Sequence, residues 1–234
     1  MKKFELTTEF ITNAFGKKLF RIKALVEFGD VKAGELGGYV EKEGNVSQAG
    51  NAWVYGNARV YGDARVYGDA EVYGDAWVSG DARVYGDAWV SDNAWVYGNA
   101  RVYGNAWVYG DARVSGNAWV SGNARVYGDA RVYGNAEVSG NAEVYGDARV
   151  CGNAWVYGNA DYALVQGFGT EFRCTTFYRG KNKKIMVNCG CFHGDLEGFR
   201  KQVKETRNGK IAKEYLMIAD LMEYHFTSED SSNE

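Results

Sequence analysis

Over its middle half, the chain alternates apolar and polar residues in a phrase of six. Ala recurs every six residues from Ala52 to Ala160, and Val follows two positions later, from Val54 to Val156. Between them stands Trp, Arg or Glu, and after Val comes Tyr, Ser or, once, Cys151. This alternation predicts short strands with Ala and Val on one side and the variable residue and Tyr on the other.

Each predicted strand is followed by Gly and then by Asn or Asp, which tolerate the positive φ angles of a corner. One hexad departs, because Asp92 stands after Ser91 where Gly is expected. We interpret it as a neutral corner variant, since an Asp side chain can bond locally. Hairpins would need alternating directions, so a coil of three hexads, about 18 residues, is preferred. Successive coils then stack as parallel strands about 4.8 Å apart.

Four parts are predicted along the 234 residues. Residues 45–161 form the solenoid, with room for about six and a half coils. Residues 1–44 form a β-rich N-terminal cap, and residues 162–226 form a C-terminal module of order ββαα. Caps are expected because the end strands of a solenoid expose unpaired backbone. The polar residues 227–234 are expected to be a disordered tail.

Local signals predict how the two ends fold. A turn is predicted at Gly16, and Gly37 and Gly38 are expected to let the chain bend into the first coil. A β-hairpin is predicted around Gly180–Lys184. Asp195 is expected to be the N-cap of an amphipathic helix with one apolar face, made of Leu196, Phe199 and Val203.

Two runs outside the hexads resemble known proteins. Gly34-Glu35-Leu36-Gly37-Gly38-Tyr39-Val40, followed by Asn45-Val46-Ser47-Gln48, resembles the start of hexapeptide-repeat proteins of bacteria and phages that are assigned to the acyltransferases. Thr175-Thr176-Phe177-Tyr178-Arg179, with Cys189-Gly190-Cys191-Phe192 after it, is similar to a module of phage and prophage solenoid proteins. The resemblance implies a left-handed triangular parallel β-helix, although the general crossover rule favours the right hand. The expected fold is therefore mainly β, with a β cap and a small α+β module.

Stacking in threes makes residues 18 apart vertical neighbours. One face then gathers aromatic residues into a patch that is large for an exposed surface. It is the candidate self-association surface, and the resemblance implies a trimer. The alternative is that the aromatic residues merely cover a thin Ala/Val core. The surface consists of Trp53, Trp89, Trp107, Tyr55, Tyr73, Tyr109 and Tyr127.

Charge narrows the range of partners. The net charge of −3 and the many Asp residues at the corners predict only weak capture of nucleic acid. No Lys lies between Lys42 and Lys181, so every basic residue of the repeat is Arg, which suits stacking on aromatic rings. Small anions or nucleotides are a further candidate class of ligand, with contacts from Arg113, Arg131, Arg149 and Arg179.

Catalytic and metal chemistry have weak support. Acyltransferases of the resembled fold use a His as general base, but the only histidines here, His193 and His225, lie outside the repeat. An acyltransferase-like site between subunits, using one of these two, stays an alternative. A zinc set is conceivable, but Cys-x-Cys spacing is tight and buried thiols suit it equally, so no cofactor is expected. That set is Cys174, Cys189, Cys191 and His193.

The function predicted from these patterns is a non-catalytic binding or scaffold protein of phage or prophage type. We expect it to be a homo-oligomer with a host or phage protein as further partner, for example a host defence component. The chain has no long apolar run, and its start lacks the apolar segment of a signal peptide. The expected location is therefore the cytoplasm of a bacterium or an infected cell, without a membrane partner.

Overall fold

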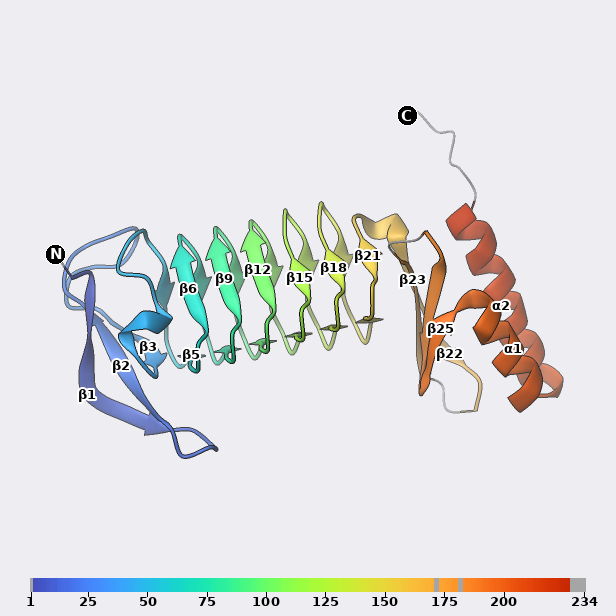
Figure 1. The fold of residues 1–234 in the computed structure, drawn as a ribbon, viewed down its shortest axis with the longest axis horizontal. Coiled ribbons are helices and arrows are strands. Elements are labelled where there is room, and N and C mark those ends of the chain that lie inside the picture. The colour runs from blue at the N-terminus through green and yellow to red at the C-terminus, as the bar shows by residue number, and fades with distance from the viewer. Residues whose placement is uncertain (1, 171–172, 181–182, 228–234) are drawn as a thin grey trace, which may run out of the picture.

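The protein is an elongated rod in the computed structural model, which describes residues 2–170, 173–180 and 183–227. Figure 1 shows an antiparallel hairpin at the N-terminal end, a solenoid along the middle, and a sheet with two helices at the C-terminal end. The chain proceeds along the rod from one end to the other. Mainly β structure with a parallel solenoid, as predicted, is confirmed.

The solenoid is built of three parallel sheets, named here by their first strand in the repeat. The β4 sheet contains β4 (Trp53–Val54), β7 (Glu71–Val72), β10 (Trp89–Val90), β13 (Trp107–Val108), β16 (Arg125–Val126) and β19 (Glu143–Val144). The β6 sheet contains β6 (Arg65–Gly68), β9 (Arg83–Gly86), β12 (Arg101–Gly104), β15 (Trp119–Val120), β18 (Glu137–Val138) and β21 (Trp155–Val156). The β5 sheet contains β5 (Arg59–Val60), β8 (Trp77–Val78), β11 (Trp95–Val96), β14 (Arg113–Val114), β17 (Arg131–Val132) and β20 (Arg149–Val150).

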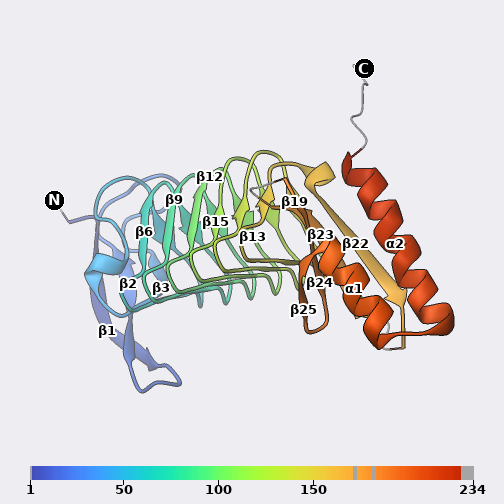
Figure 2. The same ribbon diagram turned by 45° about the vertical axis from the view of Figure 1, so that its right-hand side comes forward.

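Successive coils pair in the register that the hexads predict. Trp89 pairs with Trp107 and Val90 with Val108, so that each residue lies beside the one 18 positions further on. Figure 2 shows the coils following one another along the rod. The period of three hexads per coil is confirmed, while the left hand of the coil stays a prediction.

Small apolar side chains fill the interior of the solenoid. Every repeat Ala from Ala52 to Ala154 and every repeat Val from Val54 to Val156 is buried. Ala160 is exposed, because the repeat ends there in a short 3-10 helix, η2 (Asn159–Asp161). The inward direction predicted for Ala and Val is confirmed.

The corners need backbone angles that L-residues rarely adopt. Gly98, for example, has a φ of +71°, in the left-handed region that favours glycine. Asp92 adopts this region too, with a φ of +59°. Its Oδ2 accepts a hydrogen bond from the backbone N–H of Gly110 at 3.0 Å. The Asp92 side chain thus supports this corner through a bond to the next coil, whereas the sequence suggested a local bond.

The N-terminal cap is an extension of the β5 sheet. Strands β1 (Phe4–Thr12), β2 (Lys18–Ala24) and β3 (Leu36–Val40) are antiparallel neighbours, and β3 then pairs in parallel with β5. The short 3-10 helix η1 (Glu43–Asn45) leads into the first coil. The turn predicted at Gly16 is confirmed, with a φ of +76°.

Gly37 and Gly38 serve a different purpose from the bend expected of them. Both lie within strand β3 and neither has a positive φ. A Cβ on Gly37 would lie 2.6 Å from the carbonyl oxygen of Val54, and one on Gly38 would lie 2.6 Å from that of Ala58. The glycines therefore allow the cap to approach the backbone of the first coil closely, and the expectation of a bend was wrong.

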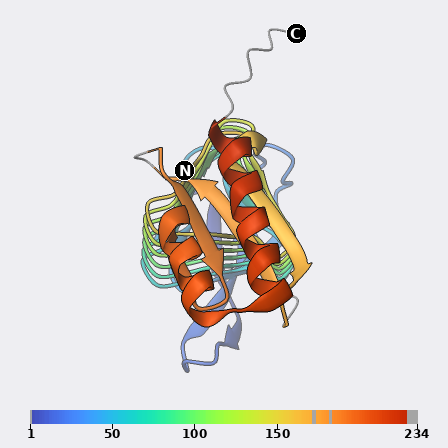
Figure 3. The ribbon, with the colours of Figure 1, turned by 90° about the vertical axis from the view of Figure 1, so that its right-hand side faces the viewer.

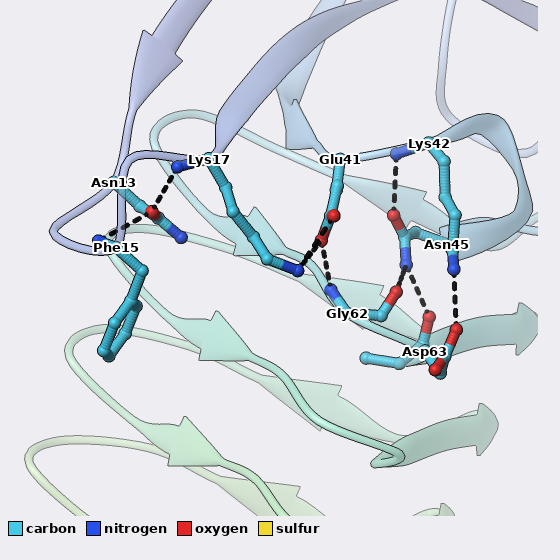
Figure 4. Close-up of polar contacts among 9 residues, drawn as sticks. Asn13, Phe15, Lys17, Glu41, Lys42, Asn45, Gly62 and Asp63 are labelled. Atoms are coloured by element: carbon cyan, nitrogen blue, oxygen red, sulfur yellow. Dashed lines mark hydrogen bonds and ion pairs between the residues drawn. The ribbon is translucent and has the colours of Figure 1, made fainter.

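Polar contacts fix the tip of the β1–β2 hairpin to the first coil (Figure 4). The Asn13 Oδ1 accepts hydrogen bonds from the backbone N–H groups of Phe15 and Lys17, each at 3.0 Å. The Lys17 ammonium pairs with Glu41 at 2.9 Å, and the Glu41 carboxylate accepts a hydrogen bond from the backbone of Gly62 at 2.6 Å. This backbone hydrogen bond is the main cause of the lowered pKa of Glu41.

The C-terminal module is a four-stranded antiparallel sheet covered by two helices. Its elements are β22 (Tyr162–Phe168), β23 (Arg173–Arg179), β24 (Ile185–Cys189), β25 (Phe192–Asp195), α1 (Leu196–Thr206) and α2 (Gly209–Thr227). The hairpin predicted around Gly180–Lys184 joins β23 and β24 and is confirmed. Figure 3 shows both helices on the outer face of the sheet, away from the coils.

The predicted order ββαα missed the strands β22 and β25. The first continues directly from η2, and the second follows a tight turn at Gly190 and Cys191. The Asp195 N-cap is confirmed, since its side chain accepts a hydrogen bond from the backbone N–H of Gly198 at 2.9 Å. The predicted apolar face of α1 is buried. The tail predicted over 227–234 lies outside the described residues, except for Thr227 at the end of α2.

Candidate interaction surfaces

Stacked aromatic rings line the outside of the β4 sheet. Trp89 and Trp107 stack with ring centroids 5.0 Å apart and an interplanar angle of 4°. Beside them, Tyr109 and Tyr127 stack at 4.9 Å and 5°. The two tryptophans are 41% and 39% exposed, respectively. Part of the predicted aromatic surface thus consists of flat, parallel rings on a rigid backbone.

Trp53 does not belong to this exposed surface. It is fully buried and packs edge-on against Phe4 and Phe28, with centroids 5.8 Å and 5.3 Å apart. The cap folds over this end of the β4 sheet, so that a tryptophan at an outward position becomes part of the core. Its assignment to an exposed interaction surface was therefore wrong.

Tyr55 and Tyr73 are tied to one carboxylate. They stack at 4.5 Å, and both hydroxyl groups donate hydrogen bonds to Glu71, which lies on the β4 sheet in the coil of Tyr73. Burial is the main cause of the raised pKa of both tyrosines, and Glu71 adds to it. These two rings are half-buried parts of the solenoid wall.

A shallow apolar pocket of about 330 Å³ opens in the aromatic surface. It lies where the column of tyrosines has a serine, Ser91. The neighbouring coil continues the column with Tyr109, and the two tryptophans form the adjoining wall. Its lining consists of Trp89, Ser91, Trp107, Val108 and Tyr109.

Arginines stack on the tryptophans of adjacent coils. Arg59 lies over Trp77 with its guanidinium carbon 5.0 Å from the ring centroid, and Arg113 lies over Trp95 at 5.1 Å. Trp77 and Trp95 themselves stack at 4.9 Å. The absence of Lys from the repeat predicted that Arg would stack on aromatic rings. In the repeat, the rings on which the arginines stack are those of tryptophan.

The four candidate anion contacts have different surroundings. Arg113 is stacked on Trp95, and Arg179 is paired with Asp161 at 3.1 Å and lies over Phe226. Arg131 and Arg149 pair with each other in register on the β5 sheet. Neither forms an ion pair with a residue in the described ranges. The structure does not bring Arg179 into the column formed by the other three.

A larger groove, of about 720 Å³, lies at the N-terminal end of the β6 sheet. Arg65 and Arg83 are neighbours in register along it, and the stacked rings of Tyr67 and Tyr85, 4.8 Å apart, lie beside them. The rest of the lining comes from residues 43–48, which lie directly beside β6, with the backbone N–H of Ser47 bonded to the carbonyl oxygen of Val66 at 2.9 Å. Sequence reasoning missed this site because it assigned the anion contacts to the β5 sheet.

The cysteine and histidine residues do not form the zinc set that was considered from the sequence. Cys189 ends β24 and His193 lies in β25, with Cys191 exposed in the turn between them. His193 Nδ1 instead lies 2.7 Å from Asn188 Oδ1 and 3.4 Å from the sulfur of Cys151 in the last coils. Within the described ranges, no three His, Cys, Asp or Glu residues are placed to hold a metal ion.

The cluster around Cys151 joins the C-terminal module to the solenoid. Asn188 Nδ2 donates hydrogen bonds to the carbonyl oxygen of Arg149 at 2.7 Å and to the Cys151 sulfur at 3.2 Å. The Tyr178 hydroxyl lies 3.6 Å from that sulfur. In the repeat, the residue after Val is Tyr or Ser at every position except Cys151. This exception is the feature of the sequence that could have indicated the contact with the C-terminal module.

Two comparisons place these observations among known proteins. A family model described as the YdcK beta solenoid repeat matches residues 52–68, 64–80, 76–92, 82–98, 94–110, 106–122, 120–134 and 124–140. Together the matches cover 52–140, which is less than half of the chain. No curated protein matches the chain. Among the described residues, no helix has the length and apolar character needed to span a membrane.

The family match agrees with the architecture, because it falls wholly within the coils. It concerns the repeat alone and leaves the resemblance to hexapeptide-repeat acyltransferases and phage proteins as a prediction. The chain is therefore a beta-solenoid repeat protein, and its repeats are similar to those of the YdcK model over residues 52–140.

Proposed function

We propose that the protein is a non-catalytic binding and scaffold protein that assembles with copies of itself through the aromatic surface of the β4 sheet. The observation that carries the proposal is the pair of stacked tryptophans, Trp89 and Trp107, beside an apolar pocket. Exposed aromatic residues grouped on one rigid face are typical of protein interfaces. A trimer remains the expected assembly, and a host or phage protein the expected further partner.

Rigidity supports a binding role for this surface. The rings are held by backbone ladders between coils, with Trp89 N–H bonded to Ala106 and Trp107 N–H bonded to Ala124, both at 2.9 Å. A partner therefore meets side chains that are already ordered, so that little conformational entropy is lost on binding. Large aromatic side chains in this state are the usual anchors of interfaces.

The test compares the assembly of two double variants by sedimentation velocity. Trp89→Ala with Trp107→Ala removes the proposed anchors, and we expect a smaller species than for the unchanged protein. Trp119→Ala with Trp155→Ala is the control, because these tryptophans are 38% and 45% exposed on the β6 sheet. Equal assembly of the two double variants would count against the proposal.

Small-anion binding is a second candidate function, favoured by the groove along the β6 sheet. Arg65 and Arg83 present adjacent guanidinium groups there, and neither pairs with an acid of the described residues. A ligand that carries a phosphate or carboxylate and a planar ring could use both Arg and the neighbouring tyrosines. The test is a thermal-shift screen with nucleotides, in which Arg83→Gln should abolish any stabilisation.

The positions of the two histidines do not support the alternative function as an acyltransferase. His193 is engaged with Asn188, and His225 packs edge-on against Phe226 at 4.9 Å. We therefore do not propose a general base at either position.

A further inference from the structure

The column of tyrosine rings beside the β4 sheet lacks one ring. Tyr55 and Tyr73 stack at 4.5 Å, and Tyr109 and Tyr127 stack at 4.9 Å, one ring for each coil. Ser91 occupies this position in the coil between Tyr73 and Tyr109. The interruption spans two coil spacings, about 10 Å, between the tyrosine positions. On one side Tyr73 packs against Trp89, with ring centroids 5.7 Å apart and an interplanar angle of 58°, so an inserted ring would stack on Tyr109.

The interruption is an open apolar site. The pocket of about 330 Å³ lies at Ser91 and is lined also by Trp89, Trp107, Val108 and Tyr109. The hydroxyl of Tyr73 is bonded to Glu71 in its own coil, and its ring packs against Trp89, outside the lining of the pocket. The pocket thus has the shape and chemistry for an aromatic ring.

The chain itself presents a ring suited to the pocket. Phe15 is 77% exposed, the most exposed large apolar side chain of the described residues. It lies at the tip of the β1–β2 hairpin, which extends beyond the outline of the coils (Figure 1). Figure 4 shows its ring pointing away from the polar contacts that hold the tip. The bonds of Asn13 and the ion pair of Lys17 with Glu41 fix the backbone that carries it.

Acidic residues predominate beside the pocket, where the Arg125 guanidinium over Trp107 is paired with Glu143. The corners beside the pocket carry the exposed residues Asp75, Asp92 and Asp111. The hairpin tip carries Lys18, whose ammonium lies over the Phe10 ring at 4.3 Å, beside Lys17, which is paired with Glu41. This arrangement attracts the tip of one copy to the pocket of another and favours one orientation.

We propose that Phe15 of a second copy of this chain inserts into the pocket at Ser91 and stacks on Tyr109. The inference rests on the proposed function, since it names the part of the partner that the aromatic surface binds. The contact joins two different regions, so it propagates from copy to copy unless the arrangement closes. A ring of three copies would use every hairpin and every pocket once.

A second serine provides a matched control. Ser79 on the β5 sheet also lies next to a stacked pair, Trp77 and Trp95, in a column that alternates tyrosine with serine from Tyr61 to Tyr133. There, Arg59 and Arg113 lie over the outer faces of the two tryptophans. Adding a ring at Ser79 therefore tests the effect of an extra tyrosine on the solenoid without filling the proposed pocket.

The experiment measures self-association by sedimentation equilibrium for the unchanged protein and for Phe15→Ala, Ser91→Tyr and Ser79→Tyr. Ser91→Tyr fills the pocket with the residue that the column otherwise uses, so the fold is kept. We expect Phe15→Ala and Ser91→Tyr each to weaken self-association at least about tenfold, and Ser79→Tyr to leave it unchanged.

The outcomes separate the two proposals. If Trp107→Ala weakens assembly while Phe15→Ala and Ser91→Tyr do not, the aromatic surface stands and the inserted phenylalanine is overturned. If all of these variants assemble like the unchanged protein, or if the unchanged protein is a monomer, both proposals are overturned. Equal loss of assembly in Ser79→Tyr and Ser91→Tyr would also overturn the pocket, because it would show an effect of any added ring.

Discussion

Replacing Val132 by Ala tests the energetic division between the inside and outside of the solenoid. Val132 is fully buried and pairs in register with Val114 and Val150 of the adjacent coils. The substitution removes two methyl groups, each contributing about 0.8 kcal/mol when buried. The backbone ladders on both sides prevent the coils from closing the cavity, which adds a further cost. We expect a total loss of about 2–3 kcal/mol in the free energy of unfolding.

Arg131→Ala is the matched control one residue away. Arg131 points outward and lies between Arg113 and Arg149 in register, so its removal takes away a like charge and no buried contact. Its effect should lie within about 0.5 kcal/mol of zero. Urea unfolding followed by tryptophan fluorescence and circular dichroism gives both free energies, with the slope m as a check on cooperativity. A cost for Arg131→Ala equal to or above that of Val132→Ala would refute the inward direction of the valines.

Three further predictions concern titration, the corners and the C-terminal helix. Burial raises the pKa of Tyr133 to about 12 and also raises the pKa of Tyr178. Because the unfolded chain loses these protons near pH 10, the free energy of unfolding measured in urea should fall between pH 10 and pH 12. A urea midpoint that stays constant over this range would contradict the prediction. Gly98→Ala should lower the free energy of unfolding more than Gly16→Ala does. A Cβ at Gly16 meets nothing within 4 Å, so that variant bears only the left-handed φ penalty of about 1–2 kcal/mol, whereas a Cβ at Gly98 lies 3.1 Å from the Gly116 nitrogen. Equal shifts in melting temperature for the two variants would argue against close contact between the coils. Asp195→Ala should cost about 1 kcal/mol of unfolding free energy through loss of the N-cap, whereas an unchanged value would mean that the cap is replaced.

The regular part of the fold could be predicted because each hexad repeats the same pattern of inward, outward and corner residues. Alternation of Ala-x-Val-Tyr fixes which side chains face inward, and Gly with Asn or Asp fixes the corners. Once three hexads form a coil, the vertical neighbour of Trp89 must be Trp107, as the register shows. No long-range information beyond the period was needed for these features.

The ends could not be predicted in the same way, because their contacts depend on segments far apart in the sequence. Trp53 occupies an outward position of a hexad, and only the packing of Phe4 and Phe28 over it makes it part of the core. Gly37 and Gly38 were assigned to a bend from their sequence alone, whereas the close approach of the first coil requires them.

The candidate site was predicted only in outline. The aromatic surface follows from the period, but the pocket at Ser91 depends on the absence of one ring between two coils. A serine within a tyrosine column was the available signal, and Ser79 gives the same signal on another face. The exposed Phe15 carries no sequence pattern that distinguishes it from a core residue, so its position could come only from the structure.

The winding of three hexads around one axis is tested most directly by cross-linking pairs of introduced cysteines at the corners. The amide nitrogen of Asn99 lies 3.0 Å from the Asn117 side-chain oxygen, 18 positions further on. Vertical neighbours have the Cα separation that a disulfide requires. Oxidation should therefore link Asn99→Cys to Asn117→Cys, identified by mass spectrometry of the joined peptides, and leave Asn105→Cys and Asn117→Cys unlinked. A disulfide at the spacing of 12 and none at 18 would contradict the coil.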